Sequence, residues 1–512
     1  MEQVDPSNGW FTALSAAGMA DGAVTREKRS PKEIAAGKAA VMKIDDEARM
    51  RQTLGLIHQL VGKPRFTSYQ MDLLRKRIPL FPPRTDFVSQ IPLLAYVAGL
   101  TTSSIGFRRF SDVLAAGAFQ CAEKGDVEGF HQIIADWHAL VGITCRNGET
   151  LIDLLVAKVT MTGPAENFRN AAWKLGLEDE ALYFEAVHQR SKTEKEERDR
   201  LRGTESPVDK LFARRGSLLG GLSGPMVGRQ VHSPPPFTDD DMRPARYADY
   251  ALFGRAFSAV GWLLMGLAAA FSYGSRYSRS QVSRGLSARM LDLLRRSDWV
   301  WIFLVGVIFP VLWYLCISRL SPLAAREWSI RTAAFIPSGG QFGSLVASLI
   351  ILPVVVAGYL LGKRGAVLGL APRFTWAGWL AAGAALAGVP VFGAIPLEGP
   401  FSKWVFVLAM VLAGVVVAWF LGGLVVAVFG KGAQSLRRDT LARMVLPAAV
   451  SGMLVMALSI PFHYAEERRW IQQDREGEIS ADSPGLSHYE YLVTQVLRGE
   501  VLEMLGNPPE FH

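Results

Sequence analysis

The amino-acid sequence predicts an all-α membrane protein, in which an extramembrane helical domain is followed by a bundle of six transmembrane helices. Three observations carry this prediction. The second half of the chain contains six uncharged runs of about 20 residues, and a helix of that length spans the hydrocarbon core of a bilayer. Charged residues make up only 20% of the sequence, below the share usual in globular domains. The first half has helix-forming composition, interrupted by Gly and Pro at intervals.

Four segments are expected along the chain. Residues 1–202 form the extramembrane helical domain. Residues 203–247 are rich in Gly, Ser and Pro and are predicted to be a linker. Residues 248–462 form the membrane domain, and residues 463–512 form an acidic tail with an amphipathic helix near 489–505.

The first segment is expected to contain several helices, with an irregular crossing over the proline-rich residues 65–92. The predicted helices cover residues 31–61, 108–124, 126–144, 149–161, 165–175 and 178–195. The two helices on either side of Gly125-Asp126 are similar to a tetratricopeptide-type hairpin, because small residues lie where the helices must approach closely. No repeat of 34 residues is found, so an array of such hairpins is not expected.

The six apolar runs are each about as long as a membrane span. They cover residues 256–273, 299–318, 342–361, 374–395, 404–429 and 444–462. Tryptophans lie near several run ends, as they do at membrane interfaces. Prolines interrupt four of the runs, which neighbouring transmembrane helices permit.

The loops between the runs predict the orientation. The first, third and fifth loops hold basic residues at 276, 279, 284, 289, 295, 296, 363, 364, 373, 431, 437, 438 and 443, whereas the alternate loops hold only Arg319, Arg326, Arg331 and Lys403. Loops rich in Lys and Arg face the cytoplasm. We therefore expect the protein to lie in the cytoplasmic membrane, with the N-terminal domain and the C-terminal tail on the side away from the cytoplasm. Since no secretory signal is visible at the N-terminus, either a membrane anchor upstream is missing from this chain or the orientation is reversed, and the first is favoured.

Two Glu-x-x-His motifs are the candidate metal ligands. Glu128 with His131, and Glu185 with His188, would each place both side chains on one helix face, as in di-iron bundles. A complete site also needs a carboxylate from each of two further helices, which the sequence offers only near helix ends. We therefore expect these four residues to be ordinary surface pairs, and we expect no metal and no cofactor.

Other site classes are excluded by composition and motif. Residues 1–250 carry 33 Lys and Arg against 32 Asp and Glu, so no basic face for nucleic acid is expected. No phosphate-binding loop, zinc-protease motif or nucleophile elbow is found, and the chain is not expected to be an enzyme. The centres of the apolar runs lack ionisable residues, which argues against ion-coupled transport and intramembrane proteolysis.

Small residues at four-residue spacing occur in the third, fourth and fifth runs, and such stripes allow transmembrane helices to pack closely. They are Gly343, Ala347, Ala384, Gly388, Gly414, Ala418 and Gly422. We expect them to pack the bundle on itself, with a face for a second copy as the alternative.

Residues 94–168 resemble a helical domain of uncharacterised bacterial membrane-anchored proteins. The resemblance rests on an Ala-rich helix, the Gly125-Asp126 turn, a second helix and the pattern LIDLLV over residues 151–156. Residues 6–10, PSNGW, are similar to the start of that domain. The resemblance implies no activity, but it implies an anchor upstream and a domain outside the cytoplasm.

Two functions follow as hypotheses. The first is a non-enzymatic membrane protein whose outer domain binds an envelope protein or component while the bundle, in contact with lipid, anchors it or forms a homo-oligomer. The alternative is a permease-like subunit for a neutral or lipid-like substrate, which needs no buried charge.

Overall fold

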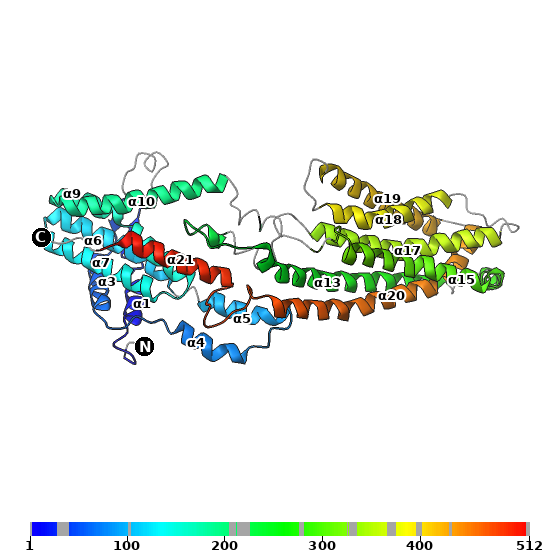
Figure 1. Ribbon diagram of the computed structural model, residues 1–512, viewed down its shortest axis with the longest axis horizontal. Helices are drawn as coiled ribbons and strands as arrows, with labels where there is room; N and C mark the ends of the chain where they lie inside the picture. The colour runs from blue at the N-terminus through cyan, green and yellow to red at the C-terminus, as the bar shows by residue number, and fades with distance from the viewer. Residues whose placement is uncertain are drawn as a thin grey trace.

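The computed structural model describes residues 3–27, 40–100, 104–203, 211, 226–275, 281–324, 326, 335–365, 375–395, 402–429 and 433–507. They form an elongated, almost entirely helical molecule, which confirms the all-α fold class. A helical front domain lies at one end and a bundle of long apolar helices at the other (Figure 1). Both chain termini lie at the front-domain end.

The helical hairpin of the front domain forms around the predicted turn. α6 (Phe110–Lys124) ends at Gly125, whose φ of +68° is the left-handed conformation that glycine adopts without strain. α7 (Val127–Asn147) begins after Asp126, whose carboxylate accepts a hydrogen bond from the Gly129 backbone nitrogen at 2.9 Å. The two helices therefore start and stop where the sequence indicates.

The remaining helices of the front domain surround this hairpin. They are α1 (Gly9–Ala20), α3 (Glu47–Val61), α8 (Leu151–Thr162), α9 (Ala165–Leu175) and α10 (Glu178–Gly203). Trp137 is fully buried at the centre of their core, and its indole nitrogen donates to the Thr160 carbonyl at 2.9 Å. The Phe168 and Phe184 rings pack edge-on against the Trp137 ring, so α7, α9 and α10 meet at one aromatic contact.

The predicted helix over residues 31–61 is wrong over residues 40–46. Residues 31–39 lie outside the described residues, and β2 (Met42–Ile44) pairs antiparallel with β1 (Val24–Arg26). α3 begins only after Asp46, whose side chain caps the Arg49 backbone nitrogen at 3.0 Å. A cap of this kind starts a helix, and the composition-based prediction overlooked it.

The crossing predicted over residues 65–92 is also more regular than expected. It contains α4 (Gln70–Arg77), the short 3₁₀ helix η1 (Ile78–Leu80) and the start of α5 (Phe87–Leu100). A further 3₁₀ helix, η2 (Ile105–Arg109), leads into α6. Pro79 lies in the first turn of η1, where its missing N–H costs no hydrogen bond.

The linker predicted over residues 203–247 ends earlier than expected. Residues 204–210 and 212–225 lie outside the described residues, but α13 (Asp239–Gly274) begins well before residue 247. Thr238 and Asp241 form a reciprocal capping box at its start. The acidic residues Asp239, Asp240 and Asp241, which lie within the predicted linker, therefore form the first turn of a long helix, where negative charge is favoured.

The C-terminal helix lies where it was predicted, but it packs into the front domain. α21 (His488–Leu505) buries Tyr489, Val493, Leu497 and Val501 in the same core as Trp137. The first and last parts of the chain thus share one hydrophobic core.

Each of the six predicted apolar runs lies in a helix of the bundle. The helices are α13, the continuous segment Arg296–Leu320, α17 (Phe335–Arg364), α18 (Thr375–Ala394), α19 (Ser402–Phe429) and α20 (Ala433–Gln473). The segment Arg296–Leu320 comprises α15 (Arg296–Phe303), the π-helical turn η5 (Leu304–Ile308), α16 (Phe309–Leu315) and a second π-helical turn, η6 (Cys316–Leu320). α17 is the most enclosed of these helices and α19 the least. Two shorter helices, α14 (Gln281–Arg289) and η4 (Met290–Leu293), follow α13.

Among the described residues, seven helices are long and apolar enough to span a membrane, as a multi-pass membrane protein requires. The seventh, Phe87–Lys124, was not among the six predicted runs. It joins α5 to α6, and α6 buries Phe110 and Leu114 in the core of the front domain. The apolar residues of α5, by contrast, are mostly exposed, and only Val97 of this helix is buried.

Candidate functional site

The predicted metal candidates make other contacts. The His131 imidazole Nε2 lies 2.9 Å from the Glu180 carboxylate, whereas Glu128 is exposed. The Glu185 carboxylate accepts hydrogen bonds from Gln189 and from Arg169, and these two bonds lower its pKa. His188, the fourth candidate, is partly buried on the same helix, α10. Within the described part of the chain, no three His, Cys, Asp or Glu side chains gather as metal ligands would.

The predicted small-residue positions fall into two groups. Ala347 and Ala384 are buried, and a Cβ added at Gly388 would lie 2.4 Å from Ser344 Oγ, so α17 and α18 approach closely there. By contrast, Gly414, Ala418 and Gly422 are exposed along α19. A Cβ added at Gly343, Gly414 or Gly422 would meet no described atom within 4 Å.

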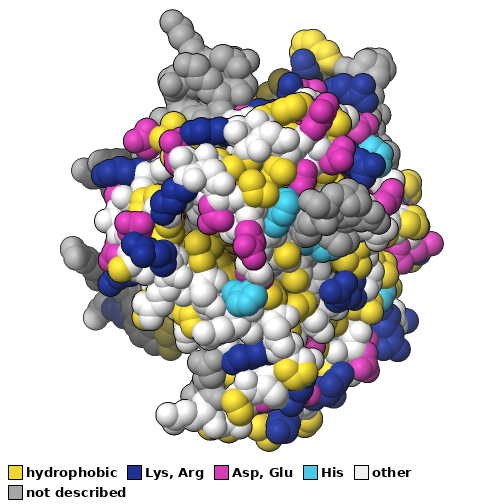
Figure 2. Space-filling model, turned by 90° about the vertical axis from the view of Figure 1, so that its left-hand side faces the viewer, with side chains coloured by type: hydrophobic (Ala, Val, Ile, Leu, Met, Phe, Trp, Pro, Cys, Tyr) yellow, Lys and Arg dark blue, Asp and Glu magenta, His cyan; other side chains and the backbone are white. Residues whose placement is uncertain are grey.

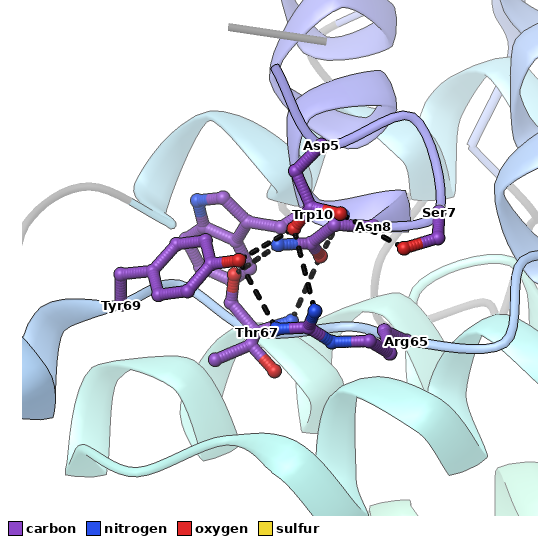
Figure 3. A network of polar contacts seen from close by, with 7 residues as sticks. All are labelled: Asp5, Ser7, Asn8, Trp10, Arg65, Thr67 and Tyr69. Carbon is purple, nitrogen blue, oxygen red and sulfur yellow. Dashed lines mark hydrogen bonds and ion pairs between the residues drawn. The ribbon is translucent and has the colours of Figure 1, made fainter.

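A polar network at the N-terminus fixes the start of the front domain (Figure 3). The buried Asn8 side chain accepts hydrogen bonds from the backbone nitrogens of Trp10 and Thr67, and donates to the Thr67 carbonyl at 2.9 Å. A Cβ at Gly9 would lie 2.8 Å from the Leu60 carbonyl oxygen, so only glycine fits there. The PSNGW sequence therefore has a structural role, which joins the N-terminus to residues 65–69.

Tyr69 completes this network in an unusual backbone conformation. Its φ of +59° is left-handed, which is rare for a residue with a large side chain. Its hydroxyl donates to the Asp5 carboxylate at 2.5 Å and accepts from the Arg65 guanidinium at 3.0 Å. The hydrogen bond from Tyr69 is the main cause that lowers the pKa of Asp5. Because Tyr69 immediately precedes α4, these contacts set the direction in which α4 leaves the domain.

The strongest concentration of buried charge lies where the bundle meets the front domain. We call it the junction cluster and define it as Arg84, Arg255, Arg319, His463, Glu466, Glu467 and Asp474. These residues come from α13, from the end of the span Arg296–Leu320, from α20 and its following loop, and from the loop before α5. They come together although some are almost 400 residues apart in the sequence.

Arg319 and Glu466 form the first ion pair of the junction cluster. Both guanidinium Nη atoms donate to the two carboxylate oxygens of Glu466, with 2.8 Å between Nη2 and Oε2. Nδ1 of the buried His463 lies 3.6 Å from the same carboxylate. A Cβ at Gly254 would come within 2.7 Å of the His463 ring, so a glycine on α13 makes room for this imidazole. The pair therefore ties the second apolar run to the last one.

Glu467 connects the bundle to the front domain. Its side chain is fully buried, one carboxylate oxygen lies 3.3 Å from the Arg255 guanidinium, and the other accepts a hydrogen bond from the Phe87 backbone nitrogen at 2.9 Å. Phe87 is the first residue of α5, and the first N–H groups of a helix have no partner within it. One buried carboxylate thus holds α13 and the start of α5 against α20.

Arg84 and Asp474 form the outermost pair of the junction cluster. The guanidinium donates to the Asp474 carboxylate at 2.5 Å and to the Asp474 carbonyl at 2.6 Å. Burial raises the pKa of Asp474, while Arg84 opposes that rise by stabilising the charged form. A Cβ at Gly477 would lie 2.5 Å from the Asp474 carboxylate, so the close turn after α20 needs glycine.

The junction cluster is suited to holding separate segments of the chain together. Its carboxylates are paired with arginines or with a backbone N–H, so in these contacts each negative charge is already compensated. The pairs link four separate segments of the chain. Removing one member would leave its buried partner uncompensated, which is costly.

The polar groups inside the bundle are likewise used to join helices. The buried Gln341 side chain of α17 donates to the Leu323 and Val389 carbonyls, at 2.8 and 2.9 Å. At the other end of the bundle, the buried Asp298 carboxylate pairs with the Arg364 guanidinium at 3.2 Å. These contacts connect α17 to its neighbours on both sides.

Sequence reasoning did not find the junction cluster. In the sequence, Arg319 stands out only as a loop charge, and Glu466 and Glu467 only as acids of the tail. A usable signal exists, because the second and sixth runs both end on the predicted outer side, one with Arg319 and the other with His463 and the two glutamates. Opposite charges at the same level of two spans are candidates for an ion pair.

Comparisons of the chain with protein-family models, with curated proteins and with solved structures give no match. The resemblance of residues 94–168 to a bacterial membrane-anchored domain stays a prediction.

Proposed function

We propose that this protein is a multi-pass anchor that holds a helical interaction domain in a fixed position against the surface of the cytoplasmic membrane. The observation that carries the proposal is the junction cluster. It fastens the front domain to α13 and α20, whose outer ends also meet through the edge-to-face contact of the Tyr247 and Trp470 rings, with 4.7 Å between their centroids. A bundle joined in this way would hold the front domain at a fixed distance from the membrane surface and at a fixed tilt to it.

The shared core of α10 and α21 supports a topology with both of these helices on one side of the bilayer. A single core cannot be divided by a membrane, so the number of crossings between α10 and α21 must be even. Six of the candidate spans lie between them. The seventh contains α6, which belongs to the same core and so does not cross by itself.

The basic loops support a location of this common side outside the cytoplasm, because loops rich in Lys and Arg face the cytoplasm. α15, which follows the first basic loop, lies at the end of the molecule opposite the termini (Figure 1). Reporter fusions at Gly285 and Gly432 should therefore read cytoplasmic, although Gly432 lies outside the described residues. Fusions that read external at both positions would reverse the proposed orientation.

The partner in this proposal is a protein or another component of the envelope. Phe119 on α6 and Trp173 on α9 are each about half exposed, and the Lys174 ammonium lies 6.0 Å from the Phe119 ring centre. Exposed aromatic residues beside charged ones are common in binding hot spots. Figure 2 shows this end of the molecule, where acidic and basic side chains are intermixed, and this arrangement does not favour nucleic acid.

Association of two copies is a further part of the proposal. α19 is the least enclosed span, and its exposed face carries Gly414, Ala418 and Gly422. If copies associate there, Gly414→Leu should reduce chemical cross-linking between copies in detergent. Val417→Leu changes an exposed position on the same helix and should leave cross-linking unchanged. If Gly414→Leu and Val417→Leu cross-link equally, copies do not associate through α19.

The anchoring function is tested by distances between spin labels in the full chain in lipid nanodiscs. Leu182 in the front domain and Leu421 in α19 are both exposed and can carry labels. If the junction cluster holds the two parts in one arrangement, the labels should give a single narrow distance distribution. Arg84→Ala should broaden this distribution. Two well-separated distances in the unchanged protein, together with flux of a neutral solute into proteoliposomes, would favour the permease-like alternative.

A further inference from the structure

The end of the bundle that points away from the front domain has an excess of positive charge. Figure 1 shows α15 at this end, which we call the far end. The chain segments that join the helices there, residues 274–298, 362–373 and 430–443, hold thirteen Lys and Arg in the sequence but only three Asp. The excess of ten bases has no counterpart in these segments.

Two of the three acids at the far end are already paired. The buried Asp298 carboxylate binds Arg364, and the buried Asp439 carboxylate lies 3.5 Å from the Arg438 guanidinium. The third acid, Asp292, is exposed in η4. Negative charge for the remaining bases therefore has to come from outside the chain.

Arg437, near the start of α20, is a partly buried base at this end. Its Nε atom is buried and has no hydrogen-bond partner in the part of the chain that the structure describes. A Cβ added at Gly358 of α17 would lie 3.6 Å from its Nη2, so the guanidinium lies against the backbone of α17. A partly buried polar group without a partner is costly, and an anion bound to it would remove that cost.

The contact between α17 and α20 gives the level of this guanidinium in a bilayer. The Cβ position at Gly358 also lies 3.9 Å from Leu441. Gly358 is three residues inside the end of the third apolar run, whereas Leu441 is three residues before the start of the sixth. Three residues of helix rise about 4.5 Å, so the two helices place this contact on either side of the boundary between hydrocarbon and headgroups, within about 5 Å of it.

The packing of α14 on α20 agrees with this level. The Ser283 hydroxyl donates to the Asp439 carboxylate at 3.1 Å, and the Arg443 Nε donates to the Ser287 hydroxyl at 3.1 Å. Asp439 and Arg443 lie five residues and one residue before the sixth apolar run. Both contacts are therefore within about 8 Å of the hydrocarbon, which is about the thickness of one headgroup layer.

Aromatic side chains mark the same boundary on α17 and α18. The Tyr359 and Trp379 rings meet edge to face, with 6.4 Å between their centroids, and both side chains are exposed. Trp376, near the start of α18, is exposed as well. Exposed Trp and Tyr rings gather at the headgroup level of a membrane, so Arg437 lies near a level where phospholipid phosphates are within reach.

We propose that Arg437 binds the phosphate group of an anionic phospholipid at the far end, between α17 and α20. A guanidinium can donate two parallel hydrogen bonds to phosphate oxygens. The exposed bases Arg289, Arg295 and Arg296 would attract the negative headgroup to this end. This lipid site goes beyond the anchoring function, but it rests on the proposed topology, because the apolar runs must cross the bilayer.

Binding of phosphatidylglycerol to the delipidated full chain in detergent tests the proposal. Native mass spectrometry counts the bound lipids as the lipid is added. The protein should bind one phosphatidylglycerol more tightly than phosphatidylcholine, and Arg437→Gln should weaken this binding about fivefold, the usual effect of one basic residue at an anionic membrane surface. Equal affinity for the two lipids, or equal affinity in the native protein and the variant, would overturn the proposal.

Arg289→Gln is the matched control, because it removes the same charge from an exposed position on α14. It should weaken the binding less than twofold. If Arg289→Gln and Arg437→Gln weaken it equally, only the net charge matters and Arg437 forms no site. Glycerol 3-phosphate at millimolar concentration should not displace the lipid, and displacement would assign the site to a soluble phosphate compound instead.

Thermal unfolding in detergent gives a second readout. Phosphatidylglycerol should raise the unfolding midpoint of the native protein, because a ligand that binds only the folded state stabilises it. The rise should be smaller in Arg437→Gln. An equal rise in both proteins would contradict a lipid site at Arg437.

A label on α19 separates failure of the site from failure of the topology. A fluorophore is attached at Leu421→Cys, after the native cysteines at 121, 145 and 316 are replaced by Ala. Brominated lipids in proteoliposomes should quench it, because Leu421 is exposed on its span. Quenching at Leu421 without preferred binding of phosphatidylglycerol would overturn the lipid site alone, whereas no quenching would overturn the topology on which the site rests.

Discussion

The indole nitrogen of Trp313 donates a hydrogen bond to the carbonyl oxygen of Leu386 at 3.0 Å. Leu386 lies four residues before Pro390, which has no N–H and so cannot bond back to this carbonyl as another residue would. A tryptophan of the span Arg296–Leu320 thus supplies the donor that α18 lacks. Neighbouring helices make prolines tolerable in membrane spans in this way.

Trp313→Phe should lower the stability of the bundle by about 0.5–2 kcal/mol, the range of hydrogen bonds between transmembrane helices. Phe keeps an aromatic ring but is smaller and has no N–H donor, so the effect combines the hydrogen bond with some lost packing, and the double-mutant cycle below separates the two. The measurement is the unfolding midpoint in detergent. Trp301→Phe, at an exposed position of the same span, is the matched control and should have no effect.

The role of Pro390 can be tested with a double-mutant cycle. In a Pro390→Ala background, the new backbone N–H can serve the Leu386 carbonyl, so Trp313→Phe should cost less than in the native sequence. An equal cost in both backgrounds would show that Trp313 acts through packing alone.

The Arg319–Glu466 pair predicts a strongly non-additive response. Arg319→Leu or Glu466→Leu alone should destabilise the protein by about 3–5 kcal/mol, because each leaves a buried charge without its partner. The double substitution should be much milder, since no unpaired charge remains. Thermal unfolding of the three variants in detergent measures this difference, and additive losses would contradict a direct pair.

The parts of the fold that were predictable are those with local signals. The Gly125-Asp126 turn combines a left-handed C-cap with an Asp N-cap, and both act within a few residues. The apolar runs and α21 have a length or periodicity that a single segment reveals. Each of these elements lies where the sequence places it.

The parts that were not predictable depend on distant partners. β2 exists because it pairs with β1, and the composition around Met42 favours a helix when read alone. Likewise, Arg84 and Asp474 meet only in the folded chain, so neither residue stands out in the sequence. The N-cap residues Asp46 and Thr238 are local signals of a helix start, but the overall composition of their segments does not reveal them.

The packing of α21 predicts a change in thiol reactivity. Cys145 is buried, its thiol lies 3.6 Å from the Arg498 carbonyl of α21, and burial raises its pKa to about 11. Leu497→Ala should cost about 2–5 kcal/mol in the core and loosen α21. Alkylation of Cys145 under native conditions should then become faster.

Cys316 serves as the internal control for this measurement, because it is exposed, lies in the span Arg296–Leu320 and does not belong to the core that contains α21. Its alkylation rate should be the same with and without Leu497→Ala. If Cys145 reacts no faster in the variant, α21 does not protect it.

Glu476 predicts a pH dependence of the contact between α20 and α21. Its carboxylate accepts a hydrogen bond from the Tyr489 backbone nitrogen at 2.9 Å, and its carbonyl accepts one from the His488 nitrogen at 2.8 Å. Burial, followed by the nearby charges of Asp241 and Asp474, raises the pKa of this carboxyl to about 7, and the Tyr489 bond opposes the rise.

The folded protein therefore binds a proton at Glu476 more tightly than the unfolded chain, whose carboxyl titrates near 4.5. Below pH 4.5 the Glu476 carboxyl is protonated in both the folded and the unfolded state and does not lower the free energy of unfolding. As the pH rises from 4.5 to 7, its ionisation destabilises the folded state progressively, by at most about 3 kcal/mol at 1.36 kcal/mol per pKa unit.

Glu476→Gln cannot ionise and keeps an acceptor for Tyr489, so its unfolding midpoint should exceed that of the native protein at pH 8 and match it at pH 4.5. The matched control is Glu478→Gln, at an exposed neighbouring position, which should follow the native protein at both values. A native protein that gains stability relative to Glu476→Gln as the pH rises would show that the charged form of Glu476 is the one the fold prefers.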